Sequence, residues 1–326
     1  MVIYLETDTG QPRARRQTVL ASANRLAFGL VTPLKQQPEV WVVEGDAAFR
    51  LGDSRIHNPY FAQIEHGEDV VASIRRRVSP MAPDPDIAIE PMNLPPGRYF
   101  PRMARPRFER PGSFPEPFDH RREFEYERST ATLHAISVVE RLRACFQVVD
   151  PNSENMNVYG VEFRNIIILA ATEAEAQFKG ILRANNYASL RRNWTISDYE
   201  KLEAAMRLSD FSLALEQYPW LDTFFPFEAW GTTAPATRLP WYAAYNALKH
   251  DRENTFAQAT LRSALEAVGA LVVLGAAQFG IHFIRDAPEL SRMFRFEHRP
   301  EWSIGDTHGR APGQEMNGEP IDYPFV

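Results

Sequence analysis

Eleven prolines between residues 80 and 117 limit what this chain can fold into more than any other feature of the sequence. Proline has no backbone N–H to donate and its ring clashes with the preceding helical turn, so neither a long helix nor a central strand can form there. We therefore expect four parts. They are an N-terminal α+β or irregular lobe at 1–79, a proline- and arginine-rich strap at 80–122, a helical domain at 123–285 and a C-terminal tail at 286–326.

The strap also carries arginines and aromatic residues at high density. They follow one another as Arg98, Tyr99, Phe100, Arg102, Arg105, Arg107, Phe108, Arg110 and Phe114. One interpretation is a nucleic-acid surface, in which the rings stack on bases and the arginines hold phosphates. We favour the alternative of a stiff connector, because proline-rich segments are semi-rigid spacers. Its aromatic side chains would then pin it to the helical domain while its arginines stay solvated.

The N-terminal lobe contains two short elements that the local pattern predicts. Residues 40–43 and 47–51 are rich in β-forming side chains and flank Glu44-Gly45-Asp46, which predicts a β-hairpin with glycine in its turn. The apolar residues between Val70 and Val78 predict a short helix.

From Glu123 onward the apolar residues recur with the period of an α-helix. The first stripe consists of Ala131, Ala135, Val138, Leu142, Cys145 and Val149. Asp150-Pro151-Asn152 should end that helix. A second long helix is predicted over 158–184 and a last one over 253–280.

Shorter elements are predicted between the second and the last of these helices. Ser197-Asp198-Tyr199-Glu200 has the pattern of a capping box, with serine and glutamate satisfying free amides of a first turn. Residues 211–216 alternate with period two, which indicates a short strand. Pro240 suits the first position of a helix that runs to about Asp251.

The segment 264–284 is long and apolar enough to cross a bilayer. Glu266, Gln278 and His282 interrupt it, and each would cost free energy in lipid. We interpret it as a central helix buried among other helices, since such helices are apolar nearly all round. No membrane association is expected.

Composition and charge exclude several classes of protein. A net charge of −6 and a pI near 5.8 leave any nucleic-acid contact to a local basic patch. The single cysteine, Cys145, excludes an intramolecular disulfide and a cysteine-rich metal site, and no histidine pair has the helical spacing of metal ligands. The sequence predicts a cytoplasmic protein with no metal and no cofactor.

Polar chemistry is densest in the short helix predicted ahead of the last long one. Tyr242, Asn246 and His250 lie four residues apart and therefore share one helix face. Tyr245 and Lys249 form a neighbouring pair. A face with an imidazole, an amide and a phenol can exchange protons and hold an anion.

The segment Tyr245-Asn246-Ala247-Leu248-Lys249-His250-Asp251-Arg252, with the apolar helix after it, resembles the last two helices of HEPN domains. The upstream segment 159–175 is similar to the second helix of HEPN-like bacterial proteins. The resemblance covers about residues 123–285. It implies a mainly α fold, a HEPN-like helical bundle beside the smaller N-terminal lobe and the strap. It also implies a homodimer and a role in bacterial defence or toxin–antitoxin biology.

Active HEPN domains carry an arginine, a polar residue just after it and a histidine a few positions further on. By this resemblance His250 takes the histidine place and Asn246 the polar place, and Lys249 joins them as a candidate catalytic residue. Tyr245 stands where the arginine is expected. A neutral phenol does not stabilise the charge developing on a phosphate as a cation does, so Lys249 or Arg252 would have to substitute.

Three interpretations of this face stay open. In the first it binds RNA, a nucleotide or a partner protein, through ligand-binding residues Tyr242, Tyr245, Arg252 and Glu173. In the second it is a metal-independent endoribonuclease that uses His250. In the third, a buried Glu173 pairs with the lysine or the histidine of the helix as a structural clamp. The chain would then be a structural or interaction protein whose strap and tail wrap a partner or a second copy.

Overall fold

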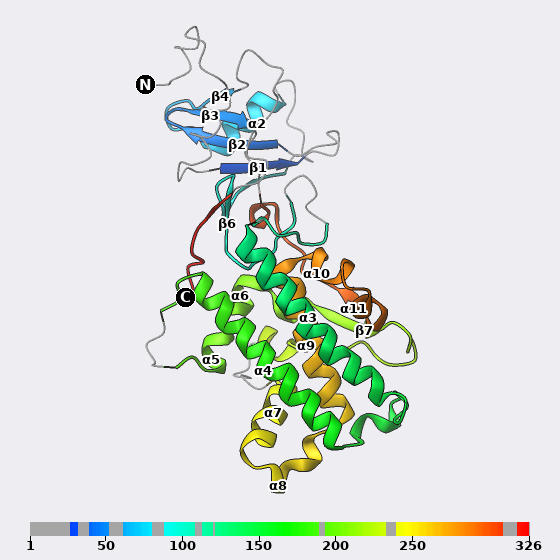
Figure 1. Cartoon of the computed structure of the whole chain (residues 1–326). Coiled ribbons are helices and arrows are strands. Elements are labelled where there is room, and N and C mark those ends of the chain that lie inside the picture. The colour runs from blue at the N-terminus through cyan, green and yellow to red at the C-terminus, as the bar shows by residue number, and fades with distance from the viewer. Residues whose placement is uncertain are drawn as a thin grey trace.

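The computed structural model describes residues 27–31, 39–51, 61–79, 88–107, 113–119, 121–188, 193–232, 239–308 and 318–325. The chain is a mixed α+β protein with 52% helix and 16% strand. Figure 1 shows an antiparallel sheet at one end of the molecule and long helices beyond it. The expectation of a mainly α fold is therefore wrong, because a five-stranded sheet and two further strand pairs stand beside the helices.

Five strands form the antiparallel sheet in the order β4-β3-β2-β1-β5. They are β1 (Ala27–Val31), β2 (Glu39–Glu44), β3 (Ala47–Leu51), β4 (Phe61–Gln63) and β5 (Ala88–Pro91). β2 and β3 form the predicted hairpin, with Gly45 at φ 61° in its turn. β5 comes from the proline-rich segment and lies at the sheet edge, where a proline such as Pro91 is tolerated.

The two faces of the sheet bury separate apolar clusters. Trp41 belongs to one face, where Ile74 of α2 (Val70–Val78) packs against it. Val42 belongs to the opposite face, in a cluster with Met92. This alternation is what a strand buried on both sides produces. The helix α2 has the bounds that the sequence predicts.

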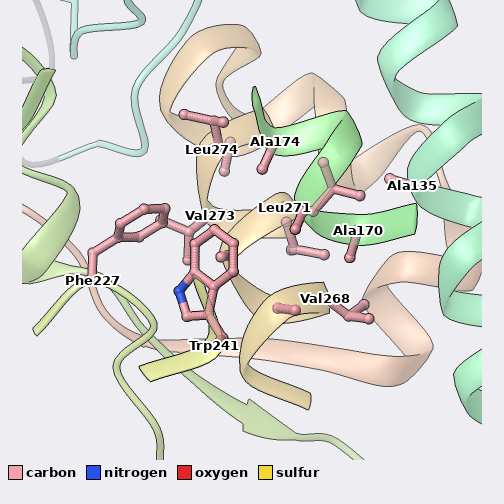
Figure 2. Close-up of a cluster of buried hydrophobic side chains, with 14 of the residues drawn as sticks. Ala135, Ala170, Ala174, Phe227, Trp241, Val268, Leu271, Val273 and Leu274 are labelled. Carbon is pink, nitrogen blue, oxygen red and sulfur yellow. The ribbon is translucent and has the colours of Figure 1, made fainter. Parts of the chain in front are cut away.

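Four long helices build the main core, and α9 lies among the other three. They are α3 (Arg122–Cys145), α4 (Val161–Ala184), α7 (Pro240–His250) and α9 (Leu261–Phe279). Figure 2 shows Val268, Leu271, Val273 and Leu274 of α9 with Ala135, Ala170, Ala174, Phe227 and Trp241. The small alanines of α3 and α4 leave room for α9 to approach closely, so a helix that is apolar all round is buried by its neighbours.

α9 is the one helix among the described residues that is long and apolar enough to cross a membrane, and 83% of that window is buried inside the protein. Its Gln278 is fully buried. The Gln278 amide donates to Gln177 Oε1 of α4 at 2.7 Å and accepts from Arg102 Nε at 2.9 Å. These are the surroundings of the core helix that we expected.

Shorter helices join and flank these four. They are η2 (Glu154–Asn157), α5 (Ile196–Tyr199), α6 (Leu202–Met206), η3 (Leu208–Asp210), η4 (Glu228–Gly231), α8 (Arg252–Thr255), η5 (Phe256–Gln258), α10 (Ile281–Arg285), α11 (Pro288–Met293) and η6 (Ile304–Asp306). The predicted capping box is wrong by two residues, because Thr195 and Asp198 form it. The last long helix begins later than predicted, where the Thr260 side chain caps it.

The C-terminal residues are built into the rest of the molecule. β8 (Phe294–His298) pairs antiparallel with β7 (Ser212–Leu215), which is the strand predicted within 211–216. β9 (Glu319–Pro320) pairs parallel with β6 (Arg98–Tyr99) of the strap.

The strap packs against its own chain through its aromatic residues, and Phe100 joins the helical core cluster, as predicted. Tyr99 stacks on Phe118, and Phe100 meets Tyr323 edge-on, with ring centroids 5.6 Å and 5.0 Å apart. Both strap residues are buried.

Two of the strap arginines, Arg102 and Arg105, depart from the prediction that the strap arginines stay solvated. The Arg102 side chain is 11% exposed, and Arg105 is 4% exposed. Arg105 lies 3.9 Å from the Trp302 ring centroid and donates to the Ala205 carbonyl. Desolvation lowers the pKa of Arg105 to about 10, which leaves it cationic at neutral pH. Phe108 and Arg110 lie outside the described residues.

Candidate functional site

α7 holds most of the predicted site residues, and the core fixes one side of it. Pro240 occupies the first turn, as predicted. Trp241 is fully buried and its indole N–H donates to the Pro226 carbonyl at 2.9 Å. Leu248 is buried about two turns further along the same face, so rotating or sliding α7 would open the core. Figure 1 shows that α7 and α8 lie at the end of the molecule away from the sheet.

Tyr242 is occupied inside the protein. It is 8% exposed, and its hydroxyl donates to Glu175 Oε1 of α4 at 2.6 Å. Lys179, one turn along α4, lies 3.5 Å from the same carboxylate. Burial and the bond to Glu175 raise the pKa of Tyr242, so this phenol stays protonated. It ties α7 to α4 and presents no free hydroxyl to a ligand.

Tyr245, which the resemblance to HEPN domains puts at the place of an arginine, is buried too, at 2% exposure. Its hydroxyl accepts a hydrogen bond from Lys249 Nζ at 2.9 Å. The ammonium also lies 5.0 Å from the centroid of the same ring. The hydrogen bond from Lys249 to Tyr245 raises the pKa of the lysine. A cation is thereby held in one position at the exposed end of α7.

The three residues of the predicted row differ in exposure. Tyr242 is buried, Asn246 is half-buried and His250 is exposed. His250 is the last residue of α7, and the Lys249 ammonium in the same turn interacts favourably with the helix dipole. The side chain of Arg252 lies outside the described part of the structure. The reachable surface of α7 therefore consists of its last turn, with Lys249 and His250.

Glu173 faces α3 and not α7. Its carboxylate bonds His134 Nδ1 at 2.9 Å and Gln177 Nε2 at 3.3 Å. Glu162 lies on the same helix face, as its spacing predicts, and bonds Arg141 of α3 at 3.2 Å. The predicted clamp between Glu173 and the lysine or histidine of α7 is wrong. The α4 carboxylate that reaches α7 is Glu175, which points to another side of the helix.

The chemistry available at the α7 end is limited. Lys249 can hold an anion, and the imidazole of His250 can exchange a proton with solvent. Among the residues that the structure describes, no group of three or more His, Cys, Asp or Glu side chains is placed to hold a metal ion.

A pocket that the sequence does not predict lies beside the N-terminal half of α9. About 540 Å³ of space there is free of protein atoms, a figure that includes open solvent. The loop after β7 forms one wall and η2 contributes Met156. Glu266 lines it, and the only signal of it in the sequence is a carboxylate that interrupts an apolar helix.

Comparison with known proteins returns no family. No family model, no curated protein and no solved structure matches the chain.

Proposed function

We propose that the helical part of this chain is a binding module for a phosphate-bearing ligand, RNA or a nucleotide, and that the last turn of α7 contacts the phosphate. One observation carries the proposal. Lys249 is an exposed cation whose position is fixed by a 2.9 Å hydrogen bond to a tyrosine of the core. A charge held before the ligand arrives loses less side-chain entropy on binding than a free lysine does.

Binding is favoured over cleavage by the position of Tyr245. In the HEPN-like motif this place belongs to a cation that stabilises charge on the scissile phosphate. Tyr245 is 2% exposed and its hydroxyl already accepts from Lys249, so neither its ring nor its hydroxyl is available to a phosphate. In a cleavage reaction His250 would have to act without a cation at position 245 to stabilise the phosphate. A cytoplasmic location, where RNA and nucleotides are at hand, is part of the same proposal.

The test is a titration of fluorescently labelled single-stranded RNA, and separately of labelled ATP, followed by anisotropy at low and moderate salt. Lys249→Ala should weaken binding about tenfold, since one charge-assisted hydrogen bond contributes roughly 1.5 kcal/mol. It should also reduce the salt dependence of log K by about one phosphate contact. Lys201→Ala, a lysine of another segment, is the matched control and should leave binding unchanged.

The same RNA samples report on cleavage when they are resolved on a gel. Intact RNA after incubation with the wild-type chain agrees with a binding module. RNA that is shortened by the wild-type chain but not by His250→Ala would replace the proposal with an endoribonuclease. Equal affinity of wild type and Lys249→Ala would remove α7 from the binding site.

A further inference from the structure

The walls of the pocket beside α9 are held together by backbone hydrogen bonds and close packing. The loop that follows β7 is closed by two backbone hydrogen bonds between Leu213 and Phe224, each 3.0 Å long. The Phe224 ring lies over Gly269 of α9, where an added Cβ would be 2.5 Å from the ring. Glycine at that position therefore lets the loop sit directly on the helix. The pocket between the loop and the helix is therefore set by contacts that belong to the fold itself.

Trp220 stands at the mouth of this pocket with its ring in solvent. It is 62% exposed, yet its indole N–H donates to the Pro151 carbonyl at 2.9 Å. Its other flank meets Tyr218, with ring centroids 5.5 Å apart. A large aromatic ring held in one orientation and left open to water is suited to contact a ligand, because its face attracts cations and apolar groups.

Glu266 is the most buried of the three charged residues that line the pocket, since Asp222 and Arg262 are exposed. It is half-buried on α9, and no described residue forms a hydrogen bond or an ion pair with its carboxyl group. Desolvation raises the pKa of Glu266. Arg262, one helical turn away, lines the pocket but makes no ion pair with it. A carboxylate withdrawn from water without a partner is costly, and a ligand that supplies one would lower that cost.

The lining selects a class of ligand. Two carboxylates, Glu266 and Asp222, stand against one guanidinium, Arg262, so the ionised side chains sum to −1. Leu265 and Met156 supply apolar surface next to them. A cation with an apolar body satisfies both parts, whereas an anion would be repelled by the carboxylates.

We propose that this pocket binds a small organic cation, an ammonium group on an apolar body. The ammonium donates to the Glu266 carboxylate and lies against the Trp220 ring, and the apolar body lies on Leu265 and Met156. This site uses α9 and the loop after β7, so it is independent of the phosphate contact proposed at the end of α7.

The experiment is isothermal titration calorimetry of the full chain with three ligands of one shape, namely hexylammonium chloride, 1-hexanol and sodium hexanoate. Hexylammonium should bind with at least about tenfold higher affinity than hexanol, because a charge-assisted hydrogen bond replaces a neutral one. Hexanoate should bind most weakly of the three. No measurable binding of hexylammonium, or equal affinity for hexanol, would overturn the proposal.

Two variants assign the contacts. Glu266→Gln keeps the shape of the side chain and removes its charge, so hexylammonium affinity should fall about tenfold or more while hexanol affinity is unchanged. Trp220→Phe keeps a ring, and Trp220→Ala removes it; affinity should decrease in that order. The control is Glu253→Gln, an exposed glutamate of α8, which should bind as the wild type does. Wild-type affinity in Glu266→Gln would also overturn the proposal.

Discussion

At the scale of single residues, His308 is the one side chain in the described part of the structure with two buried polar atoms that lack a hydrogen-bond partner. It is 1% exposed, and neither ring nitrogen has a hydrogen-bond partner among the residues described. Burial and the nearby guanidinium of Arg105 lower the pKa of His308 to about 3. The folded protein therefore holds this imidazole neutral over most of the acidic range.

The lowered pKa of His308 predicts a loss of stability in acid. An unfolded histidine takes up a proton near pH 6.5. Folded His308 does so only as the pH approaches about 3. Between these values the unfolded state binds one proton more, so the free energy of unfolding decreases as the pH falls, by at most about 1.4 kcal/mol per pH unit. Above pH 6.5 the imidazole is neutral in both the folded and the unfolded state, so His308 adds no pH dependence to the free energy of unfolding.

Urea unfolding from about pH 7.5 to about pH 4.5 measures this slope. His308→Leu should unfold with a smaller pH dependence than the wild type, since leucine takes up no proton and no hydrogen bond is lost. Carboxylates contribute equally to both chains and cancel in the comparison. Equal slopes for wild type and His308→Leu would contradict the assignment.

At the scale of elements, the bond between Tyr242 and Glu175 joins α7 to α4. Tyr242→Phe removes the hydroxyl and leaves the largely buried Glu175 carboxylate with Lys179, 3.5 Å away. We expect the free energy of unfolding to fall by about 1–2 kcal/mol, because a buried acceptor loses its donor. Chemical denaturation measures the change. Tyr126→Phe, at 73% exposure on α3, is the control and should unfold as the wild type does.

The Tyr242→Phe variant also tests whether Tyr242 only anchors α7 or belongs to the ligand-binding site. If Tyr242 only anchors the helix, RNA affinity at the α7 end should be unchanged below the unfolding transition. A loss of affinity in Tyr242→Phe as large as in Lys249→Ala would place the phenol in the binding site instead.

Sequence patterns predicted the elements whose signal is local. The helix over Val70–Val78, the helix start at Pro240 and the strand within 211–216 are all present. The buried stripe of α3 includes Ala131, Ala135, Val138, Leu142 and Cys145, as predicted. A helix period or a proline acts within a few residues, so the sequence alone is enough to place it.

The parts that sequence patterns missed depend on contacts between distant segments. β5 becomes a strand only by pairing with β1, some sixty residues earlier in the chain, and its four residues carry no period of their own. Helical spacing put Tyr242 and His250 on one face but could not indicate that α4 covers the first and leaves the second exposed. The pocket at Glu266 likewise needs a loop and a helix together.

At the scale of the whole molecule, the sheet and the helical part have separate apolar cores and meet at η6. The backbone N–H of Asn93 donates to the Gly305 carbonyl at 2.8 Å, and its side-chain Nδ2 donates to Asp306 Oδ1 at 2.7 Å. Ile304 packs against the sheet cluster that contains Val42. A segment from the C-terminal end of the chain thus packs against one face of the N-terminal sheet, so the sheet should depend on this contact for part of its stability.

Gly305 is a position where a single added methyl group should weaken the contact between η6 and the sheet. An added Cβ would lie 2.5 Å from the Pro91 carbonyl oxygen of β5, a backbone atom that moves only with its strand. Gly305→Ala should therefore lift η6 off the sheet. We expect faster amide hydrogen exchange in β1, β2 and β3, with exchange in α9 unchanged, because the helical core keeps its own contacts. Mass spectrometry of peptides from each element measures both.

The control is Gly160→Ala, where the nearest neighbour of an added Cβ is Phe163 at 3.9 Å, an ordinary contact. It should exchange as the wild type does in every element. Equal acceleration in the sheet and in α9 of Gly305→Ala would mean that the two cores unfold as one unit. Wild-type exchange in the sheet would mean that η6 does not hold it. Either result would contradict the prediction that the sheet depends on the C-terminal segment and that the helical core does not.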